Sequence, residues 1–162
     1  MMSAQRMSFP EIVRMYQQQL YWYIRRIVLV HEDAEDILQD TFIKAYRNLW
    51  KLRNSDALKP WLYRIATNEI NLYFRRRREV VPMEHLPDSE PAGTDTVTSG
   101  KVAEIISSAF LQMSPLQREV FSLKYYEDLD YVQISRITGS STNTLMVSYH
   151  EARKKIEKEI NR

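Results

Sequence analysis

Arginine and asparagine recur in the middle of the chain at the spacing of one helix face. The stretch Trp61–Arg78 contains no Pro or Gly, which predicts a single helix of about five turns. Its polar face presents amide and guanidinium groups, which can donate paired hydrogen bonds to phosphates and base edges. A solvated amphipathic helix whose basic end complements its own dipole would show the same pattern, so this stretch alone leaves both interpretations open. The polar face comprises Arg64, Asn68, Asn71, Arg75 and Arg78.

Aromatic side chains are interleaved with these charges and could stack on unpaired bases. They are Trp61, Tyr63, Tyr73 and Phe74.

A second polar pattern precedes this helix. Asp33, Asp36 and Asp40 are spaced by three and four residues on one face of a predicted helix from about Asp33 to Leu49, with Gln39 and Lys44 nearby. Acidic residues in a first turn also favour the helix dipole, so part of the pattern is ordinary helix chemistry. Aligned carboxylates could instead bind Mg²⁺ or dock a basic partner. No matching carboxylate or His cluster completes a metal site, so we expect no metal and no other cofactor.

The elements that position these residues are helices. The chain of 162 residues has only three Gly, no Cys and 44% hydrophobic residues, which favours an all-α fold with a packed core. No apolar run reaches the length of a signal peptide or a membrane span, so we expect a cytoplasmic protein without membrane insertion.

The organisation predicted is two small helical domains, 8–78 and 101–162, joined by a flexible linker, 79–100. The linker is rich in Pro and acidic residues, and residues 84–100 hold four acids and no base. Residues 1–83 instead carry 14 Lys and Arg against 9 Asp and Glu, an asymmetry that suits a polyanionic partner.

The first domain is predicted to hold three helices. Ser8 or Pro10 begins the first, which continues to about Val30, and His31 and Glu32 form a short break before the second. A loop, Trp50–Lys59, leads into the third.

The second domain is predicted to hold four helices. Ser114 and Pro115 begin one of them, and Gly139 is expected to end the helix Asp130–Thr138 in a left-handed conformation. The last helix continues to about Ile160. A short helix, a turn with Gly and a longer helix form the helix-turn-helix pattern, in which the start of the second helix enters the major groove. Its outward positions are Asn143, Thr144, Met146, Val147, His150 and Arg153.

Taken in order, these blocks resemble bacterial sigma factors of the extracytoplasmic-function type, in the sigma-70 superfamily. The resemblance covers about Phe9 to Ile160 and rests on four blocks: DAEDILQDTF with KAY (33–46), WLYRIATN (61–68) with the arginine run, MSPLQREVF (113–121), and the helix-turn-helix to Arg153. It implies a dissociable factor that binds core RNA polymerase, directs it to promoter DNA, helps open the duplex and catalyses no bond chemistry itself. It also implies an anti-sigma factor as a further partner.

The resemblance implies a role for each surface. The helix at 33–40 is expected to dock on polymerase, through Asp33, Asp36, Gln39 and Asp40. The loop and the central helix are expected to melt and read the −10 element, with Asn68 near a flipped base. The final helix is expected to read the −35 element through the six outward positions named above. The −10 residues are Leu52, Trp61, Arg64, Asn68, Asn71, Arg75 and Arg78.

The chain departs from the family at several positions. The loop has Leu52 where the family commonly has an aromatic residue, although Trp50 lies close by. Basic residues that many members carry in the last helix are replaced by Met146, Ser148 and Glu151, which predicts weaker and less salt-dependent DNA binding. Polar residues in the helix-turn-helix, where members are often apolar, predict a looser second domain. These are Ser135, Thr138 and Ser140.

Two alternatives stay open at this point. One is a helix-turn-helix DNA-binding regulator that acts without polymerase. The other is a Mg²⁺-dependent nuclease or phosphohydrolase that uses the three aspartates, for which the sequence offers no general base.

Overall fold

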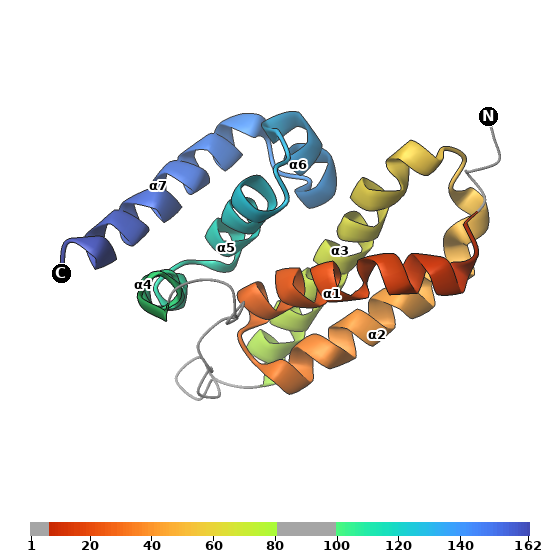
Figure 1. The fold of residues 1–162 in the computed structure, drawn as a ribbon, viewed down its shortest axis with the longest axis horizontal. Coiled ribbons are helices and arrows are strands. Elements are labelled where there is room, and N and C mark those ends of the chain that lie inside the picture. The colour runs from red at the N-terminus through yellow and green to blue at the C-terminus, as the bar shows by residue number, and fades with distance from the viewer. Residues whose placement is uncertain (1–6, 81–99) are drawn as a thin grey trace.

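The first half of the chain folds into three helices. The computed structural model describes residues 7–80 and 100–162, without the side chains of 78–80. Helix α1 spans Phe9–Val28, α2 spans His31–Asn48 and α3 spans Leu58–Val80 (Figure 1). The predicted linker therefore lies almost entirely outside the described residues.

The start of α1 confirms the predicted helix signal. Ser8 Oγ accepts a hydrogen bond from the Glu11 backbone N at 3.3 Å, and Glu11 Oε1 accepts one from the Ser8 backbone N at 2.8 Å. This reciprocal capping box satisfies two of the amide groups that a helix leaves unpaired at its N-terminus. Pro10 lies in the first turn, where its missing N–H costs nothing.

The break between α1 and α2 lies two residues earlier than predicted. Leu29, not His31 and Glu32, leaves the helical conformation, with φ 70° and ψ 0°. A left-handed conformation is uncommon for a leucine, and the buried position of this side chain, beside Phe110 and Met113, offsets its strain. The polar pair that suggested a break in the sequence instead begins α2.

The connection between α2 and α3 is more ordered than a plain loop. It forms two short 3₁₀ turns, Leu49–Lys51 and Ser55–Ala57. Asn54 Oδ1 accepts a hydrogen bond from the Asp56 backbone N at 3.0 Å, as expected for a turn residue. Helix α3 begins three residues before the predicted Trp61, with Pro60 in its first turn.

The second half holds the four predicted helices. They are α4 (Gly100–Leu111), α5 (Pro115–Phe121), α6 (Tyr131–Thr138) and α7 (Thr142–Ile160), and α5 continues as a π-helical turn, Ser122–Tyr126. Ser114 caps α5 as predicted. The apolar stripe of α7 is shorter than predicted, because Ile160 is 58% exposed.

The turn between α6 and α7 confirms the predicted helix-turn-helix. Gly139 has φ 81°, a left-handed conformation that suits glycine, and Ser141 caps α7. Ser135 Oγ donates to the Ser140 carbonyl at 2.7 Å, and the Ser140 amide donates to Thr138 Oγ1 at 3.2 Å. These polar side chains fasten the turn to α6, so its geometry does not indicate the looseness that we expected from them.

The two halves pack against each other (Figure 1). Helix α6 lies beside α3, and α5 contacts the end of α1. One apolar cluster runs through both halves and joins Leu62, Tyr63 and Ile70 of α3 to Leu123 and Ile134. Every described element is helical, which confirms the all-α prediction.

Candidate nucleic-acid and protein interfaces

The predicted amide and guanidinium face of α3 is a solvent-exposed stripe. Arg64, Asn68, Asn71 and Arg75 are all exposed, while Leu62, Ala66 and Ile70 are buried on the other sides of the helix. The side chain of Arg78, the last predicted member, lies outside the described residues. Four planar hydrogen-bonding groups therefore share one accessible face of a helix whose other sides are packed.

The aromatic residues of this region are arranged differently from the prediction. Tyr63 is fully buried, so its predicted stacking on a base is wrong for this structure. Trp61 and Leu52 are partly buried and pack against the core. Trp50, in contrast, is 77% exposed, and the Lys51 ammonium lies 5.5 Å from its ring centroid.

Trp50 is the residue that the sequence analysis left out of the predicted site. It stands at the edge of a hollow of about 780 Å³ between the start of α1 and the 3₁₀ turns. The signal for it was present, because a large aromatic side chain beside Lys51 and Arg53 in a connecting segment is unusual for a core residue. The hollow is lined by Met7, Ile12, Leu49, Trp50, Leu52, Arg53, Ser55 and Leu58.

The acidic face of α2 divides into an exposed part and an internally bonded part. Asp36, Gln39 and Asp40 are exposed. Asp33 is partly buried: Tyr73 donates its hydroxyl hydrogen to Asp33 Oδ2 at 2.6 Å, and Arg77 Nη1 lies 3.7 Å from the same oxygen. Asp33 therefore ties α2 to the C-terminal part of α3. Burial and this carboxylate together raise the pKa of Tyr73, so the phenol keeps its proton.

A groove runs along the outside of α1 and α2, next to the exposed acidic residues. Its volume is about 860 Å³, and its apolar surface comes from side chains such as Phe9, Phe42 and Tyr46. Ile43 and Tyr46 are 41% and 66% exposed, which is high for large apolar residues. Glu35, Asp36 and Gln39 line the same groove. Apolar contact area and negative charge thus adjoin one another.

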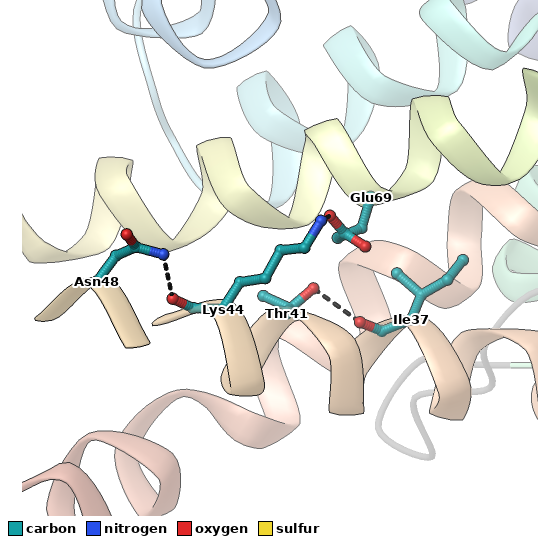
Figure 2. Close-up of polar contacts among 5 residues, drawn as sticks. All are labelled: Ile37, Thr41, Lys44, Asn48 and Glu69. Carbon is teal, nitrogen blue, oxygen red and sulfur yellow. Dashed lines mark hydrogen bonds and ion pairs between the residues drawn. The ribbon is translucent and has the colours of Figure 1, made fainter. Parts of the chain in front are cut away.

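An ion pair connects the acidic helix to the basic one. Lys44 of α2 contacts the carboxylate of Glu69, which is buried on α3 directly after Asn68 (Figure 2). Within α2, Thr41 Oγ1 donates to the Ile37 carbonyl at 2.7 Å and Asn48 Nδ2 donates to the Lys44 carbonyl at 2.9 Å (Figure 2). Since α2 and α3 also pack together, this pair helps to set the rotation of α3, and with it the direction in which Asn68 points.

Helix α7 exposes all six predicted outward positions. Asn143, Thr144, Met146, Val147, His150 and Arg153 are exposed, while Leu145 and Ala152 are fully buried. Thr144 takes part in the cap of the helix, because its backbone N donates to Ser141 Oγ at 3.2 Å. Glu151 accepts a hydrogen bond from Gln117 Nε2 at 3.1 Å, so its charge lies toward α5.

The described residues offer no alternative centre for metal chemistry. In ranges 7–80 and 100–162, no three His, Asp or Glu side chains are grouped so that they could hold a metal ion. Within the same ranges, none of the helices is both long enough and apolar enough to span a membrane.

Comparisons with known proteins agree with this arrangement. The Sigma-70 region 2 family model matches residues 12–80, which contain α2 and the exposed face of α3. The Sigma-70, region 4 model matches residues 103–156, which contain the helix-turn-helix.

Relatives and solved structures match nearly the whole chain. The chain is 30% identical to the ECF RNA polymerase sigma factor SigW of Bacillus subtilis (strain 168), over 94% of this chain and 89% of that protein. It is 27% identical to SigM of the same strain, over 96% and 97%. In fold it is similar to the sigma factor RpoE from Bartonella quintana, solved in complex with the anti-sigma factor NepR (TM-score 0.80, 23% identity, 94% and 96% coverage). The chain therefore belongs to the sigma-70 family of RNA polymerase sigma factors, in its extracytoplasmic-function (ECF) group.

Proposed function

We propose that this protein binds core RNA polymerase through the outer side of α1 and α2, opens and reads the −10 element with α3 and its preceding turns, and reads the −35 element with α7. The observation that carries the proposal is the exposed stripe of Arg64, Asn68, Asn71 and Arg75 on an otherwise packed helix. Packing against the hydrophobic core does not account for four exposed planar donors in a row on α3. A polynucleotide, in contrast, supplies hydrogen-bond acceptors along its whole length.

The polymerase contact combines two features of the α1–α2 surface. The apolar groove offers area for the hydrophobic centre of an interface, and Asp36 and Gln39 line it with polar groups. Asp40, exposed on the same helix, adds a further negative charge. A helical partner with apolar residues flanked by Lys or Arg would complement it. Asp33 contributes differently from the other three, because Tyr73 and Arg77 already hold its carboxylate. We assign it to positioning α2 against α3.

Duplex opening needs surfaces that favour unpaired bases over paired ones. Trp50 supplies an exposed ring, and the hollow beside it has room for a base. Base–aromatic stacking contributes about 1–3 kcal/mol per base, which offsets part of the few kcal/mol needed to unstack and unpair one. Asn68 and Asn71 then offer amide groups to base edges. We therefore add Trp50 to Leu52 and Trp61 as residues that contact the −10 element.

The −35 contact uses a helix that is poor in positive charge. Of the six outward residues, only Arg153 is permanently cationic. Few phosphate contacts predict low affinity for duplex DNA and a shallow dependence of that affinity on salt. We therefore expect stable promoter binding only when polymerase holds both reading surfaces on the same DNA. This expectation separates the proposal from a regulator that acts without polymerase, which would bind duplex promoter DNA tightly by itself.

The proposal contains no catalytic step by this chain and places it in the cytoplasm with polymerase and DNA. A nuclease built on the three aspartates is disfavoured by the bonding of Asp33 to Tyr73 and Arg77, which would compete with a metal ion. An anti-sigma factor that covers the polymerase- or DNA-binding surfaces belongs to the same proposal. It is supported by two solved fold neighbours, the sigma factor RpoE in complex with the anti-sigma factor NepR and CnrH in complex with the cytosolic domain of CnrY.

Transcription from fragmented bacterial genomic DNA tests the proposal. Purified core polymerase is assayed over many rounds with and without this protein, and with a second sigma factor as the control for active polymerase. We expect discrete new transcripts that share two upstream elements. A different result would contradict the proposal: the control sigma factor directs transcription, but this protein yields no new transcript and binds duplex DNA tightly without polymerase. The protein would then be a DNA-binding regulator that acts without polymerase.

A further inference from the structure

The first two turns of α7 are the part of a helix-turn-helix that lies against base edges, and here they carry no charged side chain. Between Arg136 on α6 and His150 on α7, the chain has no Lys, Arg, Asp or Glu. In the major groove, Arg and Lys read guanine, and Asp and Glu accept a hydrogen bond from the amino group of cytosine. This part of α7 therefore lacks the charged side chains that read G·C pairs.

The exposed side of the same two turns is apolar at its centre. Met146 and Val147 are 45% and 59% exposed, while Leu145 is fully buried and Ser148 is 8% exposed. The core of the second half is therefore filled by other residues of α7, and Met146 and Val147 add little to it. Because the two are neighbours, they form one small apolar patch on the side of the helix that is expected to face DNA.

Helical spacing places this patch between two polar side chains. Asn143 precedes the patch by three and four residues and His150 follows it at the same spacing, so all four residues share one face of α7. At about 1.5 Å per residue, Asn143 and Val147 are about 6 Å apart along the helix axis. This distance is close to two base pairs at about 3.4 Å each.

The cap of α7 engages the remaining polar group of the first turn. Ser141 Oγ accepts a hydrogen bond from the Thr144 backbone N at 3.2 Å and donates one to Thr144 Oγ1 at 3.0 Å. The hydroxyl oxygen of Thr144 is therefore already hydrogen-bonded within the protein. Discrimination between bases at this turn then depends mainly on the Asn143 amide and on the apolar patch.

We propose that Met146 and Val147 read the −35 element through the 5-methyl groups of thymines, an inference that rests on the proposed function. This methyl group is the apolar feature that distinguishes thymine in the major groove, and an apolar side chain gains free energy by removing it from water. The Asn143 amide suits adenine, with which it can form two hydrogen bonds. The base pairs that face the first two turns of α7 are therefore A·T pairs, with thymines at two neighbouring positions.

Replacing thymine by uracil tests this reading, because uracil keeps the base pair and lacks only the methyl group. Core polymerase with the full-length protein first selects active promoters from templates that are randomised over the −35 element. Each thymine of the selected element is then replaced singly by uracil, and the affinity for the promoter is measured from initiation at increasing concentrations of the complex. At two neighbouring positions we expect a loss of about fourfold, which corresponds to about 0.8 kcal/mol for one buried group of this size.

Substitutions in the patch assign each methyl group to a side chain. With Val147→Ala, the uracil penalty at one of the two positions should fall below about twofold while the other stays near fourfold, and Met146→Ala should show the reverse. Val102→Ala, on a similarly exposed valine of α4, is the matched control and should keep both penalties. Met146→Arg should change the preferred pair at its position from A·T to G·C, because Arg pairs with guanine.

The outcomes separate thymine reading from the sigma function. If the protein directs transcription but uracil at every −35 thymine leaves promoter affinity unchanged, or the selected elements carry G·C pairs there, thymine reading is wrong and the proposed function stands. If it directs no transcription, the proposed function fails, and the comparison is repeated on duplexes that the full-length protein selects by itself at low salt. Selection of no duplex, or equal affinity for thymine and uracil, then overturns thymine reading; a loss that Val147→Ala removes supports it.

Discussion

Arg118 should be one of the most important single side chains for stability. Its guanidinium donates three hydrogen bonds: Nε to the Ile27 carbonyl at 2.9 Å, and Nη1 to the Phe110 and Met113 carbonyls at 3.0 and 2.7 Å. The side chain is 6% exposed. It therefore fastens the end of α1, the end of α4 and the turn before α5 at one point.

The cost of removing this group follows from those contacts. A hydrogen bond to a charged group contributes about 1.5–3 kcal/mol net to stability. Removing the guanidinium also removes the free-energy cost of burying its charge, which offsets part of this loss. Met fills a similar volume but leaves three carbonyls without their donor. We expect Arg118→Met to lower the free energy of unfolding by about 3–5 kcal/mol, and the melting temperature by roughly 10 °C. Arg118→Lys should lose about half as much, because one ammonium cannot reach both sides.

Urea denaturation followed by circular dichroism measures this difference. Arg136→Met is the matched control, because Arg136 is exposed on α6 and the same change there should cost less than about 1 kcal/mol. If Arg118→Met costs no more than Arg136→Met, the three hydrogen bonds do not stabilise the fold and the account of the α1–α5 contact is wrong.

Three further changes test the surfaces and the buried acid. Asp36→Lys should weaken binding to core polymerase roughly tenfold in a fluorescence anisotropy titration, relative to Glu104→Lys, because it reverses charge at the rim of the α1–α2 groove; normal binding would place the docking surface elsewhere. Asn68→Ala should reduce open-complex formation, followed by permanganate reactivity, by roughly tenfold or more with polymerase binding unchanged, whereas equal loss of both would indicate a folding defect. Burial raises the pKa of Glu119 to about 8, with the neighbouring Arg118 opposing, against 4.5 for an ordinary glutamate. The folded chain then holds more protons between these values, so its free energy of unfolding should fall as the pH rises from about 5 to about 8. Glu119→Gln should flatten that fall in urea titrations at pH 5.5, 6.5 and 7.5, and a slope equal to that of Glu104→Gln and the unchanged protein would refute the assignment.

Local signals predicted much of the fold. The capping boxes at Ser8 and Ser114, and Gly139 at the end of α6, were all predictable because each depends on residues within four positions of one another. The exposed stripes of α3 and α7 were predictable for the same reason, since helical periodicity fixes which side chains share a face. Leu29 was not predictable, because its left-handed conformation is stabilised by burial against α4 and the turn after it.

The burial of α3 on two sides could not be derived from periodicity. Tyr63 is fully buried. One turn further along α3, the Thr67 and Tyr23 hydroxyl groups share a hydrogen bond of 2.6 Å. The sequence suggested that Tyr63 could stack on a base. In the structure its ring instead packs against Tyr23 of α1, with ring centroids 5.1 Å apart, and lies close to Glu127 in the turn before α6.

The charge distribution and the contact between the halves favour the same order of events. The outward face of α7 has few cations, so it adds little affinity for DNA at random sites. The contact between the halves packs α6, which precedes α7 in the helix-turn-helix, against α3, so α7 belongs to the same compact body as the other reading helix. Polymerase binding through α2, whose Asp36 and Asp40 remain exposed in this closed arrangement, requires no prior opening. On the proposed function, docking of α2 on polymerase can therefore come first, and engagement of the two promoter elements follows from it.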